Sequence, residues 1–399
     1  MSKLGDIALW GLEVPALNGR ERSVLRHIAD CQTERMGGNV LSCECGHREV
    51  HYNSCRDRHC PLCQGAARAR WVQARLSELL PCPYFHVVFT VPHELIPLAL
   101  ANRHLFYDAL FTCVRETLLA VCANPENLGA RVGGMAILHT WNQKLAFHPH
   151  LHCIIPGGGV SPDGTRWITG KLNYLVSVRR LSAVFRGKLL SYLDASIGKG
   201  EVQGDEPALR ASLRKAAEKA FVVYAKPPFG GPEQVVKYLG RYTHRIGISE
   251  QRIVSADAQQ VSFSWIDRAA GHARKRMTLP HEVFIQKFML HILPKGLRKI
   301  RYFGYMGNRD RISSLAHVRA LIQADCADHC HQGTAWHAPA EELLESGTEV
   351  CVWTICPNCG SHMKVERSIG SPSAPSCLKD RLVFLQEIHG PAPNDVVIA

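Results

Sequence analysis

The sequence predicts an α+β protein, and three features of the chain lead to this fold class. Apolar, β-branched runs alternate with segments whose apolar residues recur at helical spacing, in the order β-α-β-β-α-β-α. Sixteen cysteines are concentrated near the two ends, with six in residues 31–63 and six in residues 326–377. Three histidines alternate in one apolar stretch: His148, His150 and His152. We therefore expect a central α+β domain flanked by small metal-binding modules.

The overall composition restricts the class of protein. The 399 residues carry a net charge of +12, so polyanions are the expected partners, and nucleic acid is the commonest of these. No apolar run approaches the roughly 20 residues that a membrane span needs, and the N-terminus lacks the pattern of a secretory signal. We expect a cytoplasmic protein with no membrane partner, in which the cysteines stay reduced.

The first cysteine cluster, "CECGHREVHYNSCRDRHCPLCQ", has the spacing of a zinc module. It contains two pairs of closely spaced cysteines, and each pair can supply two of the four thiolates around one tetrahedral ion. The simplest ligand set is therefore Cys43, Cys45, Cys60 and Cys63. Cys55 and His59 are plausible substitutes, and Cys31 lies farther upstream. A redox C-x-x-C would need a βαβ context that is absent here. We expect a structural zinc, with Arg56 and Arg58 beside it as DNA contacts.

The central domain accounts for the alternating pattern. Strands are expected at residues 84–92, 133–143, 150–156 and 221–229, and helices at residues 102–123, 178–197 and 231–246. The first six of these elements follow the order of a ferredoxin-like or RRM-like palm. The middle two strands would form a hairpin through "LAFHP". We expect Gln143 to lie opposite His150, and because Pro149 suits a strand end, we expect the second strand to begin at His150.

The alternating histidines admit three interpretations. They could be half-exposed residues on the polar face of a strand, although His-x-His-x-His is rare. In a histidine-triad nucleotide hydrolase, His150 would be a nucleophile, but that class leaves the zinc module and the basic C-terminal half unexplained. We favour a divalent metal site in which His150 and His152 are ligands and Gln143 or His148 is the third.

A nucleophile for such a metal site lies in "KYLGRYTHRIGIS", residues 237–249. Tyr238 and Tyr242 are four residues apart, so they share one face of the expected helix. Positive charge surrounds them, contributed by Lys237, Arg241, His244 and Arg245. Taken without the rest of the sequence, the simpler interpretation is that the two tyrosines pack one face of an amphipathic helix. The chemical reading gains weight because the same chain carries His-Leu-His on a palm strand.

These motifs resemble those of a known family, the two-tyrosine, rolling-circle transposases of the HUH class, of the IS91 type of bacterial insertion sequence. The His–hydrophobic–His motif is matched within "HPHLHCIIPGGG", the paired tyrosines within "KYLGRYTHR", and the zinc module within "NSCRDRHCPLCQ". The resemblance covers residues 20–305 and keeps the family's motif order. The first cysteine pair departs from it, being C-x-C where two intervening residues are expected.

The resemblance implies an enzyme that nicks and rejoins single-stranded or locally melted DNA at the ends of a mobile element. Tyr238 and Tyr242 would form 5′-phosphotyrosine links, with Mg²⁺ or Mn²⁺ at His150 and His152 and a structural Zn²⁺ in the N-terminal module. Such an enzyme would act in the bacterial cytoplasm, on the nucleoid. The competing hypothesis is a non-catalytic, zinc-dependent DNA-binding regulator on the same scaffold.

The C-terminal third adds basic and aromatic residues that suit single-stranded DNA, among them Lys299 and Arg301. Farther on, Cys356 and Cys359 could form a second zinc ribbon with Cys326 and Cys330. The expected organisation is a zinc module at residues 1–80, a palm with the tyrosine helix at 81–250, a DNA-contacting extension at 251–310 and a C-terminal region at 311–399.

Overall fold

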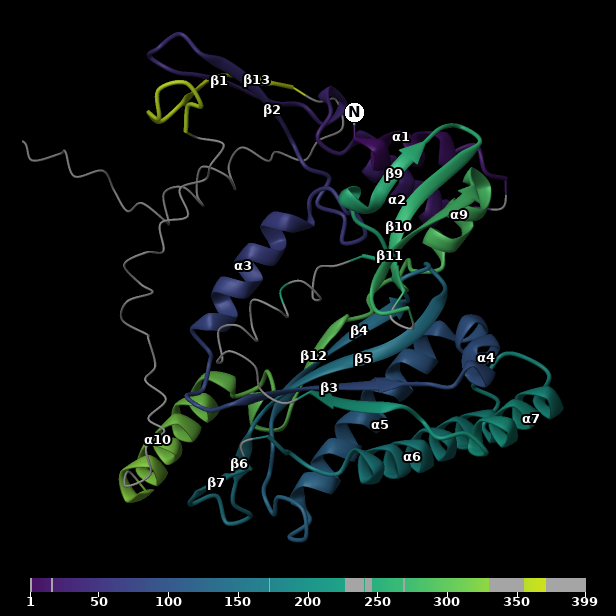
Figure 1. Cartoon of the computed structure of the whole chain (residues 1–399), viewed down its shortest axis with the longest axis vertical. Coiled ribbons are helices and arrows are strands. Elements are labelled where there is room, and N and C mark those ends of the chain that lie inside the picture. Colours follow the sequence, from purple (N-terminus) through teal and green to yellow (C-terminus); the bar gives the residue numbers. More distant parts are fainter. Residues whose placement is uncertain are drawn as a thin grey trace, which may run out of the picture.

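The computed structural model describes residues 2–15, 17–171, 173–226, 240, 246–267, 270–329 and 355–370. Within this part of the chain, helices and antiparallel sheets form two lobes, and the helix α3 (Gln64–Leu76) runs between them (Figure 1). The expected α+β class is therefore confirmed. None of the helices in the described ranges has the length and apolar character needed to cross a membrane.

The palm is the lower lobe of Figure 1 and is built on a five-stranded sheet in the order β12-β4-β5-β3-β8. All neighbouring strands are antiparallel. The strands are β3 (Tyr84–Thr90), β4 (Gly134–Trp141), β5 (Phe147–Pro156), β8 (Val223–Lys226) and β12 (Ile300–Phe303). Four of them follow the expected chain order, whereas β12 comes from beyond the palm and pairs with the edge of β4.

One face of the palm sheet is covered by helices (Figure 1). Alternate strand residues such as Phe89, Leu151 and Leu138 point to this face, where they join a large buried cluster with Phe106 and Phe185. The covering helices are α4 (Ile96–Ala101), α5 (Arg103–Ala123), α6 (Val178–Gly198) and α7 (Glu206–Ala217), preceded by the 3-10 turn η2 (His93–Leu95). Burial of these apolar faces holds the palm together.

The opposite face of the same sheet is covered at one end and carries the histidines at the other. At the covered end, Ile137 and Ile154 pack with Leu315 and Val318 of α10 (Arg311–His329). The hairpin of β6 (Gly158–Val160) and β7 (Trp167–Thr169) and the turn η4 (Gly304–Met306) lie at the same end. Farther along β4 and β5, the residues on this face are histidines instead of apolar side chains.

The second lobe combines segments that are distant in sequence. The N-terminal helices α1 (Lys3–Gly11) and α2 (Gly19–Asp30) share one buried cluster with strands and a helix from residues 246–292, which we call the composite lobe (Figure 1). Leu25 of α2 packs in the same cluster as Phe263 and Phe284. The later elements are η3 (Glu250–Arg252), β9 (Ile253–Ala256), β10 (Gln260–Asp267), β11 (Ala273–Pro280) and α9 (His281–Met289).

A small three-stranded sheet lies beside the composite lobe, which we call the ribbon. It joins β1 (Gly38–Ser42) and β2 (Arg48–Tyr52), which follow the turn η1 (Glu34–Met36), to β13 (Lys364–Ile369) from the C-terminal region. Figure 1 shows β13, in yellow, lying along β1. The expected helix at residues 231–246 falls almost entirely outside the described residues.

Candidate metal and DNA site

Three histidines from two neighbouring strands converge on the open end of the palm sheet. His139 of β4 pairs directly with His150 of β5, and His152 is the next β5 residue on that face. One ring nitrogen from each lies within 4.8 Å of the other two, and the Nε2 atoms of His150 and His152 are 3.1 Å apart. His139 and His152 are buried, and His150 is half-buried. This cluster has the geometry of a three-ligand metal site.

Hydrogen bonds to the outer ring nitrogens orient the cluster. Nδ1–H of His150 donates to the carbonyl oxygen of His148 at 2.7 Å. Nδ1 of His152 lies 2.8 Å from Nε2 of His86, on the adjacent strand β3. Burial lowers the pKa of His86 to about 4, so its ring is neutral near pH 7 and can accept this hydrogen bond. Both Nε2 atoms are then left as lone-pair donors facing each other, an arrangement that a cation stabilises.

The hairpin register differs from the expected one, and this changes the third ligand. His139, and not Gln143, lies opposite His150, because the turn lies earlier in the chain, at Asn142–Ala146, than the expected turn through residues 145–149. Gln143 lies in that turn, where its carbonyl oxygen accepts a hydrogen bond from Arg252 at 2.5 Å. The strand also begins earlier, at Phe147, and the register shifts between His139 and Trp141. The two residues His148 and Pro149 therefore face one β4 residue in a β-bulge.

The bulge explains why a proline is tolerated in the middle of β5. Strand β3 ends at Thr90, opposite His150, so Pro149 has no β3 residue beside it. On the β4 side the bulge interrupts the ladder. The same bulge removes His148 from the cluster, because it shifts that residue out of register with His150 and His152.

The two tyrosines lie outside the described residues, as do Lys237, Arg241 and Arg245. The described residue between them, Gly240, has helical geometry and lies against α3. A Cβ atom added at Gly240 would come within 2.3 Å of Cγ2 of Val72. Gly240 is therefore needed for a close approach to α3.

The N-terminal cysteines do not form the expected set of four. Cys60 and Cys63 join Cys31 and Cys55, with all four sulfur atoms within 4.8 Å of one another, while Cys43 and Cys45 belong to a second tetrad. In the first tetrad, sulfur contacts from Cys31 and Cys55 raise the pKa of the Cys60 thiol. Four thiolates crowded in this way require a cation, and a tetrahedral S₄ set suits Zn²⁺. Cys31, which the spacing left as an outlier, is a full member.

His59 has a different role from the ligand substitute that the spacing suggests. Its Nδ1 lies 3.0 Å from a carboxylate oxygen of Asp57, and its Nε2 accepts a hydrogen bond from the Leu293 amide at 3.1 Å. Arg58 is also engaged, since it donates to the Leu297 carbonyl at 2.8 Å. Both residues therefore fasten the cysteine loop to the segment that follows α9.

The residues expected to contact DNA lie in different surroundings. Arg56 is exposed next to the first tetrad. Lys299 lies beside the histidine cluster, with Nζ 5.1 Å from the ring centre of Trp141, which stacks on His139. Burial lowers the pKa of Lys299 to about 7. Arg301 points to the helix-covered side of the sheet, where it pairs with Asp108 of α5 and lies over Phe111.

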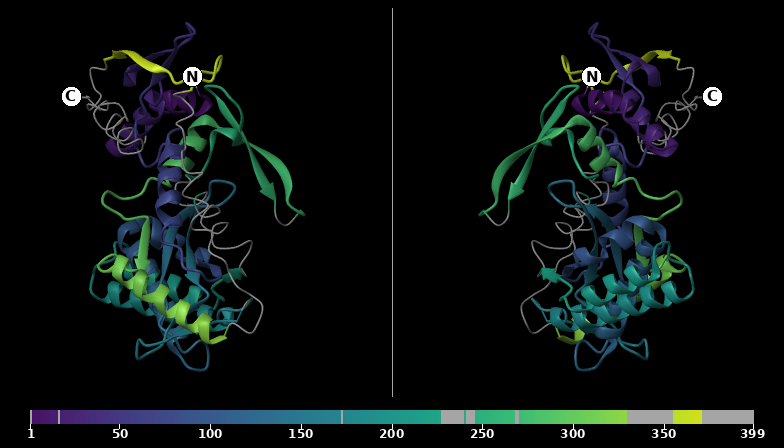
Figure 2. Two further views of the ribbon diagram at one scale, coloured as in Figure 1. Left: turned by 90° about the vertical axis from the view of Figure 1, so that its left-hand side faces the viewer. Right: turned by 90° about the vertical axis from the view of Figure 1, so that its right-hand side faces the viewer.

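A basic hairpin within the expected DNA-contacting extension at residues 251–310 projects from the composite lobe. Beyond the buried Phe263, strands β10 and β11 extend away from the body as an arm (Figure 2). The arm exposes three consecutive cations, Arg274, Lys275 and Arg276. Trp265, opposite Lys275, lies under Nζ of Lys144 from the β4–β5 turn at 4.3 Å. These cations come from the run "ARKRM" in the basic, strand-like stretch at residues 252–280.

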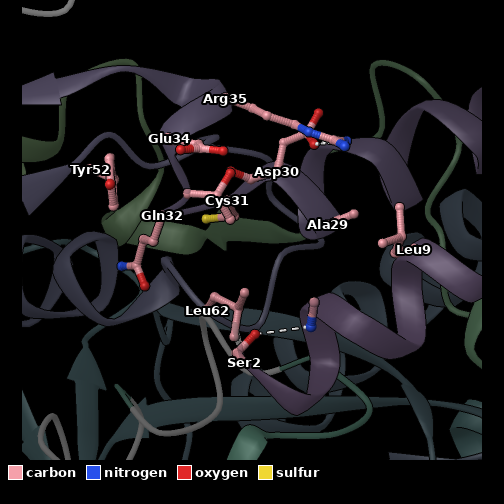
Figure 3. A pocket seen from close by; sticks show the side chains of 12 residues that line it. Ser2, Leu9, Ala29, Asp30, Cys31, Gln32, Glu34, Arg35, Tyr52 and Leu62 are labelled. Atoms are coloured by element: carbon pink, nitrogen blue, oxygen red, sulfur yellow. Dashed lines mark hydrogen bonds and ion pairs between the residues drawn. The ribbon is translucent and has the colours of Figure 1, made fainter. Parts of the chain in front are cut away.

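A pocket of about 470 Å³ lies away from the histidines, between α1, α2 and the loop after α2 (Figure 3). Cys31 of the first tetrad lines it together with Asp30, Glu34 and Arg35. Arg35 is paired with Asp30 at 3.2 Å, so its charge is balanced within the pocket wall. The remaining carboxylate of Glu34 makes this pocket a poor binding site for phosphate.

Two family models match the chain. The model described as "Transposase zinc-binding domain" matches residues 12–91, and the model described as "Putative transposase" matches residues 133–313. The first match confirms the expected zinc-binding module. The two matches define a transposase with a zinc-binding N-terminal domain.

Curated relatives identify the family. The protein named "Putative transposase y4qJ" of Sinorhizobium fredii is 46% identical over 380 residues, covering 91% of this chain and 93% of the relative. The transposase for insertion sequence element IS801 of Pseudomonas savastanoi pv. phaseolicola is 29% identical, covering 75% and 73% of the two chains. The chain belongs to the IS91 family of transposases.

Among solved structures, the conjugative relaxase TrwC in complex with oriT DNA, in a metal-bound form, has a TM-score of 0.22. It is 13% identical, with 40% of this chain and 70% of the relaxase covered. A likeness at that TM-score supports no statement about this chain.

Proposed function

We propose that this transposase cuts and rejoins one DNA strand at a time at the open end of the palm, using tyrosine nucleophiles beside the histidine cluster. The observation that carries the proposal is the convergence of His139, His150 and His152, with nitrogens within 4.8 Å, in a chain of this family. The two-tyrosine motif is the second support. A non-catalytic regulator would have no need of three oriented imidazoles on an open sheet face.

The three histidines would hold one divalent cation. That ion would draw charge from a phosphodiester oxygen and make the phosphorus more electrophilic. Because the described donors are all imidazole nitrogens, the site suits Mn²⁺ better than Mg²⁺, which prefers oxygen ligands. His86 acts as a positioning residue, since its hydrogen bond to Nδ1 of His152 presents Nε2 to the cluster.

The reaction is a transesterification. The phenolic oxygen of Tyr238 or Tyr242 forms a bond to phosphorus as the bond from phosphorus to the 3′-oxygen breaks. The proton that leaves the phenol is balanced by the one that the 3′-oxygen takes up, so the products are a 5′-phosphotyrosine and a 3′-hydroxyl. Because the number of phosphoester bonds is unchanged, a second 3′-hydroxyl can reverse the step and join the strand without ATP.

The DNA would be single-stranded or locally melted at the cut, since the tyrosine must reach one backbone in line. Support for such a substrate comes from the arm, where Arg274 and Arg276 can neutralise phosphates and Trp265 offers a stacking surface. We assign a structural Zn²⁺ to Cys31, Cys55, Cys60 and Cys63. The enzyme would act in the cytoplasm, where the chromosome lies.

Covalent capture of DNA tests this proposal. Purified protein with Mn²⁺ and single-stranded oligonucleotides covering the element's ends should form a protein–DNA adduct that survives denaturation. Tyr238→Phe and Tyr242→Phe should each keep some adduct, because a Phe substitution removes only the hydroxyl, and the double variant should form none. Complete transposition should be largely lost in both single variants.

The controls separate the chemistry from folding and binding. The double Phe variant should still bind the oligonucleotides and keep its zinc. Adduct formation by the double variant, or by wild-type protein after chelation of the divalent metal, would overturn the proposal. Normal transposition by one single variant would show that only the other tyrosine is a nucleophile.

A further inference from the structure

A second group of four cysteines is assembled from the two ends of the chain. Cys43 and Cys45 lie in the loop between β1 and β2, and Cys356 and Cys359 precede β13. The Sγ atoms of Cys43 and Cys359 are 3.4 Å apart, and those of Cys45 and Cys356 are 3.5 Å apart. All four lie within 4.8 Å of one another. Zn–S bonds of about 2.3 Å in a tetrahedron place the sulfurs about 3.8 Å apart, close to these spacings.

Both cysteine pairs have the backbone of a metal-binding knuckle. The Gly46 amide donates to the Cys43 carbonyl, and the Gly360 amide donates to the Cys356 carbonyl, each at 2.9 Å. Each glycine follows the second cysteine of its pair and has a positive φ, +85° for Gly46 and +74° for Gly360. Glycine adopts this conformation without strain, so each turn can bring its two sulfurs to one side.

The contacts around the tetrad are too weak to hold residues 355–370 in place by themselves. Among the described residues, the buried cluster there consists of Leu41, Cys43, Cys356 and Met363. The ion pairs of Lys364 with Glu44 and of Arg48 with Glu366 are largely exposed, so each contributes little. A segment with so small a core needs a further constraint such as a structural metal.

We propose that Cys43, Cys45, Cys356 and Cys359 bind a second structural Zn²⁺, which fastens residues 355–370 to the N-terminal ribbon. Only Cys43 and Cys45 lie within the matched zinc-binding domain, which ends at residue 91, so that domain by itself lacks half of the ligands of this site. The proposal is independent of the tyrosine chemistry. It requires two zinc ions in each full-length chain, one in each tetrad.

Zinc content of the purified full-length protein tests the proposal. Wild type should contain two zinc ions per chain, and the double variant Cys356→Ser/Cys359→Ser should contain one. Asn358→Ala, in the same knuckle but without a ligand, should retain two. Cys43→Ser/Cys45→Ser should also contain one, because it removes the other half of the same site.

Two further measurements keep the test decisive. Cobalt substitution should give the charge-transfer absorption of tetrathiolate sites, and half of it should disappear in the Cys356→Ser/Cys359→Ser variant. Hydrogen exchange of β13 should become fast in that variant while α2 stays protected. Retention of two zinc ions by this variant would overturn the proposal. So would a wild-type protein with one zinc ion and a mass reduced by two hydrogen atoms for each disulfide formed among these cysteines.

Discussion

The histidine cluster and the cysteine tetrads are both metal-binding geometries, but the chain builds them in different ways. His86, His139, His150 and His152 lie on three adjacent strands of one sheet, so strand pairing alone brings them together. Cys45 and Cys356 are 311 residues apart and meet only because β13 joins the ribbon. A site on adjacent strands takes its geometry from a sheet that is stable without metal. A site assembled from distant segments helps to hold those segments together.

The largest expected effect comes from removing the first tetrad. Cys60→Ser should lose one zinc ion and unfold the composite lobe, because zinc binding contributes about 10–16 kcal/mol to comparable structural sites and Cys60 is fully buried within that lobe's core. Near-ultraviolet circular dichroism and protease resistance should show the lobe open and α5 intact. A fully folded Cys60→Ser protein would show that the first tetrad is not needed to hold the composite lobe together.

The next effect separates the proposed third ligand, His139, from Gln143, one of the two residues that the sequence suggests. His139→Ala should abolish metal-dependent nicking, with a loss beyond the roughly 10–100-fold typical of outer-shell partners. Gln143→Ala should retain most activity, because Gln143 lies in the turn and its backbone carbonyl, which the substitution keeps, accepts the hydrogen bond from Arg252. Single-turnover rates over a range of Mn²⁺ concentrations measure both. Equal losses of nicking rate in His139→Ala and Gln143→Ala would instead support Gln143 as a metal ligand.

A smaller effect should come from the contact between α3 and the segment that carries the tyrosines. Gly240→Ala forces a Cβ against Val72, and overpacking of this kind costs about 1–3 kcal/mol. Adduct formation should fall with zinc content unchanged. Val72→Ala alone should change little, and the double variant Gly240→Ala/Val72→Ala should recover activity. Failure of Val72→Ala to rescue would show that Gly240 matters for another reason.

The arm should affect binding and leave the chemistry unchanged. Neutralising Arg274, Lys275 and Arg276 together should weaken oligonucleotide binding and reduce the slope of log K against log salt by about 0.7 for each phosphate that these side chains no longer neutralise. The nicking rate at saturating DNA should stay close to that of wild type. Fluorescence anisotropy at several salt concentrations measures the slope. An unchanged slope would remove the arm from the DNA interface.

The smallest effect is a dependence on pH at Lys299. Burial lowers the pKa of Lys299 to about 7, and repulsion from the nearby positive charge of Arg58 lowers it to a smaller extent. The positive charge of Lys299 is therefore present below about pH 7 and is lost as the pH rises through this value. The attraction of Lys299 for DNA phosphates should therefore decline between about pH 6 and about pH 8, within about one pH unit of this pKa. Lys299→Arg should remove this decline, because arginine stays charged throughout. If the DNA affinities of wild type and Lys299→Arg changed in the same way with pH, the decline would not come from the titration of Lys299.

Sequence reasoning succeeded where pairing is local. The alternation of His150 and His152 placed them on one strand face, and the order of strands and helices in the palm followed from periodicity. It did not place His139 opposite His150, because hairpin register depends on the turn and on a bulge, and neither the Asn142–Ala146 turn nor the bulge at Pro149 was recognised. The expected strand at residues 133–143 already contained His139. Counting in steps of two from Met135 places His139 on the same face of that strand as Met135.

The cysteines show a different limit. Four ligands near one end of a chain are the simplest grouping, but "CECG" and "CPNCG" share a glycine after the second cysteine, and that shared turn was the available sign of a pair. No periodicity could show that α1 and α2 pack with residues 246–292, because such long-range packing leaves no local pattern. Expected boundaries at residues 80 and 251 therefore run through a single core.

The composite lobe has a consequence for how the protein is made. Leu25 leaves the ribosome early, but Phe263 and Phe284, which share its core, follow more than two hundred residues later. At about 5–20 residues per second, the apolar faces of α1 and α2 wait on the order of tens of seconds for their partners. Four of the five palm strands, β3, β4, β5 and β8, are made before those partners and can pair within that interval, whereas β12 follows later. A nascent chain of this transposase would thus possess its histidine cluster before the composite lobe is closed, and chaperones are expected to bind the apolar surface that is still exposed.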